Sequence, residues 1–233
     1  MKIEKLFYLF SILAITFYFL SCQSDKAKET KVEQLETIAA DKSIPDYARY
    51  GLKSGVIEMV SSTMGMKQYI TIYFDDYGKL ITNEIKMNAF GMDTHLKTIM
   101  KDDYIYSFDV NKKVGTKGKI DSSGHQNINY LTLDKSEMEK FNIKYVGESE
   151  VLGKKCKDYI ITMPEQNVEA TASIWKGIAL KSVAKAMGMT MKIEATNIQE
   201  NVKIPEEIFE IPDDIIFEEM QEIIDDYSTQ VAK

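Results

Sequence analysis

The chain has 233 residues, a formal net charge of −7 and 44% hydrophobic residues, so it is long enough to bury one sizeable core. The acidic balance argues against a nucleic-acid-binding protein, because such proteins gather lysine and arginine where they meet phosphate. With only two histidines and two cysteines, the chain has few residues for a metal site or for nucleophilic catalysis.

The N-terminal 21 residues have the three parts of a secretory signal. A basic start is followed by an apolar run over 6–20, and the small residue Ser21 precedes Cys22. The apolar run is shorter than the roughly 20 residues that a permanent membrane-spanning helix needs. We therefore expect residues 1–21 to be removed as a signal peptide.

A polar segment connects the signal to the rest of the chain. Residues 22–45 are expected to form a tether that ends at Pro45, and within it 28–40 has apolar residues at helical spacing and predicts a short helix. The remaining residues, 46–233, are expected to form a single domain.

The apolar period changes to two after Lys53, which is typical of strands. Residues 67–74 and 79–87 alternate in this way and predict a hairpin. Its turn contains Gly78, and glycine suits the positive φ that such turns require.

Another pair of strands, a loop and a short helix are expected next. Residues 96–101 and 104–110 alternate around two aspartates, whereas 111–124 is rich in lysine, glycine and serine and predicts a long loop. Asp134 followed by Glu137 forms a capping box, which predicts that a short helix begins there.

The second half of the chain continues with strands and ends in an acidic segment. Residues 205–212 are expected to be extended, and 213–230 to form an acidic amphipathic helix. The expected strands are 145–151, 156–163, 171–176, 179–186 and 187–195. Regularly spaced strands with few helices indicate an α+β, mainly β fold, in which an antiparallel sheet curves into an incomplete barrel.

The stretch Phe19-Leu20-Ser21-Cys22 resembles the lipobox of bacterial lipoproteins, in which a small residue precedes the modified cysteine. The resemblance implies that Cys22 becomes the first mature residue and carries a diacylglyceryl thioether and an N-acyl chain such as palmitate. Several acyl chains anchor a protein to a membrane far better than one. Asp25 lies in an early polar tether that resembles those of lipoproteins sent to the Gram-negative outer membrane. The implied location is the cell envelope, at the outer membrane and facing the periplasm.

Four segments of the domain resemble an uncharacterised bacterial lipoprotein family whose fold is similar to that of the LolA/LolB lipoprotein carriers. They are 50–55, 73–78, 200–205 and 209–212, and the last two form a strand that leads to a phenylalanine between two prolines. The resemblance implies an incomplete antiparallel barrel, wrapped around helices, with an apolar cavity.

A group of aromatic and methionine side chains is expected to line this cavity, because alternation gathers them on single strand faces. The residues are Tyr69, Tyr73, Met87, Trp175, Met187, Met189 and Met191. Methionine is flexible and suits cavities that accept varied ligands. Two alternatives stay open for the Met-x-Met spacing, namely ordinary core packing and Cu(I) binding by the thioethers.

Few residues are left for catalysis. If Cys22 carries lipid, Cys156 has no partner and is expected to be buried as a small hydrophobe, although its flanking lysines allow the alternative of a reactive thiol. His95 and His125 do not have metal-ligand spacing, so no metal, cofactor or catalytic residue is expected. The sequence thus predicts a non-enzymatic envelope lipoprotein that binds or carries a hydrophobic ligand. The alternative is a structural or interaction module whose concave face is filled by its own side chains.

Overall fold

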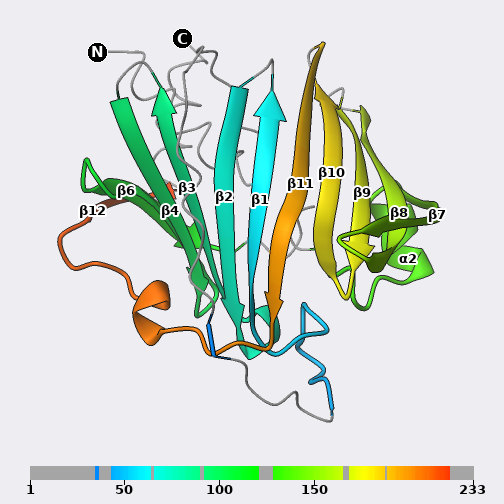
Figure 1. Cartoon of the computed structure of the whole chain (residues 1–233), viewed down its shortest axis with the longest axis horizontal. Coiled ribbons are helices and arrows are strands. Elements are labelled where there is room, and N and C mark those ends of the chain that lie inside the picture. Colours follow the sequence, from blue (N-terminus) through cyan, green and yellow to red (C-terminus); the bar gives the residue numbers. More distant parts are fainter. Residues whose placement is uncertain are drawn as a thin grey trace.

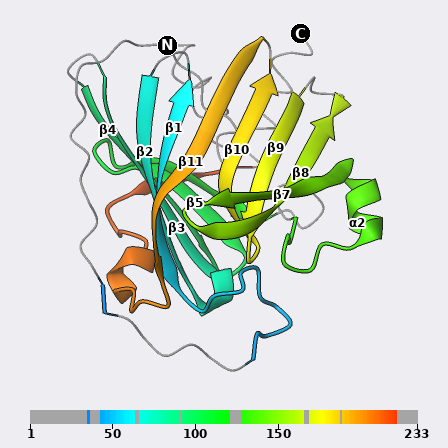
Figure 2. The ribbon, with the colours of Figure 1, turned by 45° about the vertical axis from the view of Figure 1, so that its right-hand side comes forward.

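The computed structural model describes residues 35–36, 43–63, 66–89, 92–120, 128–164, 168–186 and 188–220. Its strands form one continuous twelve-stranded sheet. Figures 1 and 2 show this sheet strongly curved into an open half-barrel. The predicted mainly β fold with a curved, incomplete barrel is therefore confirmed. In the part of the chain that the structure describes, no helix is long and apolar enough to cross a membrane.

The strands follow one another in the sheet almost in chain order. The first half of the chain forms β1 (Gly55–Thr63), β2 (Met66–Asp75), β3 (Leu80–Ala89), β4 (Met92–Lys101), β5 (Tyr104–Asp109) and β6 (Val114–Lys119). The second half forms β7 (Ile143–Val151), β8 (Lys154–Met163), β9 (Val168–Trp175), β10 (Ile178–Ala186), β11 (Met189–Glu200) and β12 (Ile216–Glu219). The two halves join where β1 pairs antiparallel with β11, so β12 and β7 are the two edges of the sheet.

The predicted hairpins are confirmed, and their turns show why these residues are needed. The predicted strand 67–74 lies in β2, and all of the predicted strand 79–87 except residue 79 lies in β3; the two are joined by the 3-10 turn η1 (Asp76–Gly78). Gly78 has a φ of 85°. Asp102 and Asp103, between β4 and β5, have φ values of 53° and 62°, a conformation that aspartate tolerates better than most residues.

The expected loop over 111–124 is wrong for part of its length, because residues 114–119 form β6. This strand pairs with β5, and Gly115 lies directly opposite Phe108. A Cβ on Gly115 would lie 2.6 Å from the Cβ of Phe108. The glycine that suggested a loop instead leaves room for the neighbouring aromatic residue. Residues 121–127 lie outside the described residues.

The expected helix over 213–230 is also wrong for residues 213–219, whereas Met220 is helical. Residues 216–219 form β12, which pairs parallel with β6. The ring of Phe217 packs edge-on against Tyr106 and Phe108, with centroid distances of 5.6 and 5.9 Å. These contacts and the ladder with β6 make the strand the better solution for this segment. Residues 221–230 lie outside the described residues.

The short helices follow local rules. In α2 (Lys135–Lys140), the Asp134 side chain accepts from the Glu137 amide, and the Glu137 side chain accepts from the Asp134 amide, which confirms the predicted capping box. The segment 205–212, expected to be extended, contains the 3-10 turn η4 (Glu206–Phe209). Of the expected helix 28–40, the structure describes only residues 35–36, which are not helical. The signal peptide and Cys22 also lie outside the described residues.

A largely apolar segment after β11, residues 201–211, lies against the sheet and is called the outer strap here. The Ser54 hydroxyl donates to the Val202 carbonyl at 2.6 Å, and the Thr82 hydroxyl donates to the Ile208 carbonyl at 3.0 Å. Phe209 is buried in a cluster with Val56 of β1 and with the strap residues Val202, Ile204 and Ile208. Both hydroxyls belong to fully buried side chains, so these hydrogen bonds fix the strap in one position.

Two hairpin turns offer a matched test of packing at the junction between residues 43–53 and the sheet. Gly177 and Gly153 both have a positive φ, of 80° and 72°. A Cβ on Gly177 would collide with the carbonyl oxygen of Arg49, whereas a Cβ on Gly153 would meet nothing within 4 Å. We expect Gly177→Ala to lower the free energy of unfolding by about 1–3 kcal/mol more than Gly153→Ala does. Urea denaturation measures both; equal losses would mean that the contact at Arg49 does not constrain the turn.

Candidate functional site

Strand alternation gives the sheet two chemically different faces. On β3, Ile85 and Met87 point to one side, and Glu84 and Lys86 point to the other. The same alternation of apolar and charged residues occurs along β11. The apolar side carries the largest core cluster, and the outer strap lies on the charged side. We therefore call the apolar side the inner face of the half-barrel and the charged side its outer face.

The inner face is apolar but not fully closed. Several of its side chains are only partly buried: Ile70, Ile72, Ile85, Met87, Leu96, Met100, Ile105, Met189 and Ile193. Deeper side chains, such as Phe74 and Leu180, are fully buried. A concave surface lined by partly accessible aliphatic side chains can hold a hydrophobic molecule.

The structure places three of the predicted lining residues on this face. Met87 lies on β3, and Met189 and Met191 lie on β11 opposite Ala186 and Ala184. The three are on one face but not side by side, because β2 and β1 lie between β3 and β11.

Of the other predicted lining residues, Trp175 contacts the core cluster, and Met187 is not among the described residues. Trp175 packs, partly buried, against the core cluster, and the ammonium groups of Lys154 and Lys176 lie 5.0 and 4.8 Å from its ring centroid. Both distances suit cation–π contacts. Met187 lies outside the described residues.

Tyr69 and Tyr73 lie on the outer face, which corrects the expectation that they face the cavity. Tyr73 packs beside Val56 and the outer strap. Burial, together with the nearby charges of Glu84 and Glu58, raises the pKa of Tyr73 to about 12. In β2 the tyrosines alternate with isoleucines, so the sequence alone does not show which set faces the interior. In the structure, Ile70 and Ile72 occupy the inner face, and the tyrosines do not.

Cys156 is a core residue, as expected from the sequence. It is 1% exposed, and its Sγ donates to the Lys154 carbonyl at 3.4 Å. Burial raises the pKa of the Cys156 thiol, and Asp158 adds to this effect, while a backbone hydrogen bond opposes it. The thiol is therefore protonated at neutral pH, which argues against the reactive-thiol alternative.

A pocket of about 360 Å³ opens at the rim of the half-barrel, where β8, β9 and β10 meet the start of β11. It is lined by Thr162, Pro164, Val168, Glu169, Lys185, Ala186 and Gly188. The Lys185 ammonium lies 4.0 Å from the Glu169 carboxylate, so the mouth is polar while Val168 and Ala186 belong to the core. The pocket thus extends the inner face towards solvent.

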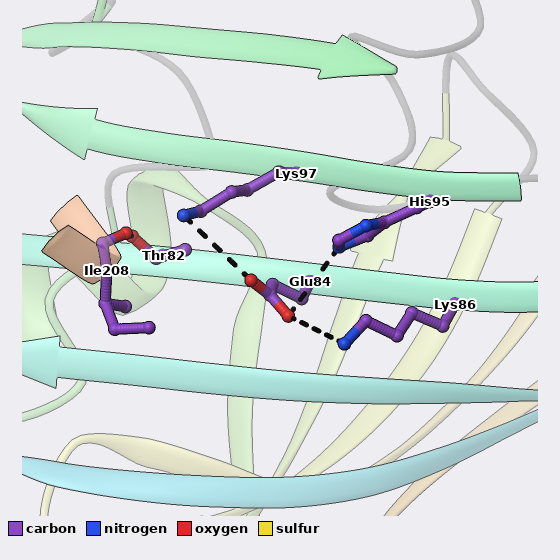
Figure 3. A network of polar contacts seen from close by, with 6 residues as sticks. All are labelled: Thr82, Glu84, Lys86, His95, Lys97 and Ile208. Carbon is purple, nitrogen blue, oxygen red and sulfur yellow. Dashed lines mark hydrogen bonds and ion pairs between the residues drawn. The ribbon is translucent and has the colours of Figure 1, made fainter. Parts of the chain in front are cut away.

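The outer face holds a compact network of charged side chains, shown in Figure 3. The Glu84 carboxylate lies 3.4 Å from Lys86, 3.7 Å from His95 and 3.9 Å from Lys97. The contact with His95 and the charges of Lys86 and Lys97 lower the pKa of Glu84 below its usual 4.5, against the effect of burial. Burial lowers the pKa of Lys97, and Glu84 opposes this.

This network lies next to the point where the outer strap is held. It sits beside Thr82, which holds the outer strap through the Ile208 carbonyl (Figure 3). The Glu84 carboxylate contacts the ammonium groups of Lys86 and Lys97 and the imidazole of His95. Within these residues, no three histidine, cysteine, aspartate or glutamate side chains come close enough to hold a metal ion.

The sequence patterns did not identify two polar residues of the inner face, Asn83 and Thr116. Asn83 Oδ1 and Thr116 Oγ1 are buried polar atoms without a hydrogen-bond partner. The available signal was weak, since each is a single polar residue in an otherwise apolar face, between Ile81 and Ile85 or between Val114 and Gly118.

Comparison with known proteins places the chain in no described family. No protein-family model matches the sequence, and no curated protein matches it either. The open, curved sheet itself agrees with the fold implied by the resemblance to the LolA/LolB carriers.

Some solved structures resemble the chain at low sequence identity. An uncharacterized conserved protein from Thermus thermophilus is 7% identical, with a TM-score of 0.49 over 72% of this chain and 91% of that one. MucB of Pseudomonas aeruginosa, in complex with MucA, is 15% identical, with a TM-score of 0.44 over 69% of this chain and 56% of that one. LprF from Mycobacterium bovis is 10% identical, with a TM-score of 0.34 over 67% and 90%. At these values the likeness carries no conclusion about function.

The network around Glu84 makes a pH-dependent prediction. A carboxylate whose pKa is lowered on folding stabilises the protein above its unfolded pKa, and this contribution is lost as pH falls through the folded pKa. Glu84→Gln should therefore lower the free energy of unfolding by about 1–3 kcal/mol at pH 7, and by less as pH drops below 4.5.

Urea titrations at several pH values measure this effect. Glu194→Gln is the control, because Glu194 forms an exposed ion pair with Lys181, and such pairs contribute about 1 kcal/mol or less. A loss for Glu84→Gln that does not change with pH would contradict the assigned role of its charge.

Proposed function

We propose that the protein is a non-enzymatic, lipid-anchored lipoprotein of the cell envelope that binds or carries a hydrophobic molecule on the inner face of its half-barrel. The observation that carries this proposal is the run of partly accessible aliphatic side chains along the inner face of β2 to β5. A protein without a ligand gains stability by closing such a surface, so its accessibility favours an occupant.

The shape of the sheet supports the same proposal. A curved sheet presents many side chains to one volume, and the core cluster fills only its deeper part, around Phe74, Ile81 and Leu180. The rim pocket beside β9 and β10 provides a polar opening to the apolar surface. Together these features fit a molecule with a long apolar part that enters from one end of the half-barrel.

The N-terminal sequence supports anchoring of the domain at a membrane. Cys22 follows a signal-like segment and a small residue, and the polar tether that follows favours the outer membrane and its periplasmic side. Acyl chains on Cys22 would hold the domain at the membrane.

The ligand is tested by native mass spectrometry of the chain from Gln23 onward, exported through a cleavable signal and purified without detergent. A bound mass that is extracted by organic solvent supports the proposal and identifies the ligand class. A clean ligand-free mass that takes up no added fluorescent fatty acid would refute it in favour of an interaction module.

Two neighbouring residues of β3, one on each face of the sheet, give a matched pair of variants that test ligand binding by the inner face. Ile85 lies on the inner face, whereas Lys86 points outward and is 55% exposed. We expect Ile85→Gln to weaken binding of a fluorescent hydrophobic probe about tenfold, because a polar group replaces buried aliphatic surface. Lys86→Gln should leave the affinity unchanged; equal effects of the two variants would place the binding surface elsewhere.

Lipid attachment is tested by metabolic labelling with tritiated palmitate. The full chain should incorporate label and fractionate with membranes, and Cys22→Ser should abolish both. Cys156→Ser is the control, because Cys156 is the one other cysteine and is buried in the core. Label that persists in the Cys22→Ser variant would contradict the assignment.

A further inference from the structure

Four polar residues form a continuous row across the inner face, one on each of the strands β3, β4, β5 and β6. Asn83 lies directly opposite Thr98, Thr98 opposite Ser107, and Ser107 opposite Thr116. Directly opposite residues have their Cβ atoms about 5 Å apart, on the same face of the sheet. The four side chains therefore form one band, called the polar row here.

The hydrogen bonds of the polar row are incomplete. The hydroxyls of Thr98 and Ser107 bond to each other at 3.1 Å. At the two ends, Asn83 Oδ1 and Thr116 Oγ1 are buried without a hydrogen-bond partner, and Thr116 as a whole is only 1% exposed. Buried polar atoms in proteins are nearly always paired, so two unpaired atoms in one row require an explanation.

Apolar rows lie on both sides of the polar row. On one side, Ile85 pairs with Leu96, and on the other side Ile81 pairs with Met100 and Met100 with Ile105. Valine or leucine would pack equally well at the four positions, because the surrounding inner face is aliphatic. The polar row thus crosses an apolar surface that does not need it for packing.

The inner face also has almost no charge. Among its described residues on β1 to β6, Asp109 is the one ionisable side chain, and on the edge strand β12 the exposed Glu218 lies directly opposite Thr116. Its carboxylate accepts from the amides of Asn111 and Lys112 at 3.0 and 3.1 Å and lies 3.3 Å from the Lys112 ammonium. Asp109 is thereby satisfied, and no inner-face cation of these strands is present to bind an anionic group.

We propose that the polar row binds the uncharged glycerol ester head of an acylglycerol lipid, with its acyl chain along the apolar rows. A hydroxyl donor of the head bonds to Asn83 Oδ1, and its hydroxyl and ester oxygens bond to Thr116 and the Thr98–Ser107 pair. Lipids with anionic heads bind more weakly, because they would bring a further negative charge near the carboxylates of Asp109 and Glu218. This proposal rests on the proposed function and specifies the ligand class of the same face.

The test compares two lipids with the same acyl chain. Tritiated 1-oleoylglycerol and oleate are equilibrated at pH 8 with the full chain in amphipol, with empty amphipol as the blank. We expect 1-oleoylglycerol to bind about tenfold more tightly than oleate, which corresponds to roughly one or two hydrogen bonds. In Asn83→Leu/Thr116→Val the two affinities should become equal within about twofold, while the Tm stays the same or rises because no unpaired polar atom remains.

Thr94→Val is the matched control, because Thr94 lies on the inner face of β4 but pairs with Met87, outside the polar row. It should keep the preference for 1-oleoylglycerol. Binding of both lipids with equal affinity by the parent chain, or a preference that survives in the double variant, would overturn the role of the polar row and leave the proposed function intact. If neither lipid binds, the proposed function fails as well.

Discussion

The register of the antiparallel strands β3 to β6 is the constraint on which the inner face depends. Short turns set this register: Asp102 and Asp103, both at positive φ, place Lys101 opposite Tyr104 and thereby Thr98 opposite Ser107. A slip by one residue would turn every side chain of a strand to the other face. Charged residues such as Glu84 would then enter the apolar interior, so burial itself enforces the register.

The two faces of the same strands carry different kinds of polar side chain. On the outer face, Glu84 contacts the ammonium groups of Lys86 and Lys97 and the imidazole of His95 beside the outer strap, and Thr82 holds the strap by its hydroxyl. On the inner face, Asn83 lies between these two residues in the chain, and its Oδ1 has no partner. Three successive residues thus serve both faces of the strand, and each face keeps a buried polar atom without a hydrogen-bond partner: Asn83 Oδ1 on the inner face and His95 Nε2 on the outer face.

Local sequence patterns predicted the elements well, and pairings between distant segments explain what they missed. The hairpin of β2 and β3 and the capping box of α2 follow from short-range rules. The strand at 114–119 could not be predicted, because its glycines are explained by residues of other segments: Phe108 on the neighbouring strand for Gly115, and Met220 for Gly118. The faces of Tyr73 and Ile72 could not be assigned either, since a period of two does not say which side becomes the interior. The polar row requires three registers at once, which no local pattern contains.

The two edge strands of the open sheet affect whether separate molecules associate when they are crowded together. An uncovered edge strand can recruit another chain by continuing the ladder. One edge is the four-residue strand β12, which is acidic at Glu218 and Glu219. The other, β7, is interrupted by a bulge at Gly147 and carries exposed charges at Glu148 and Glu150. At high local concentration the molecules meet edge to edge more often, and these features let them collide without polymerising.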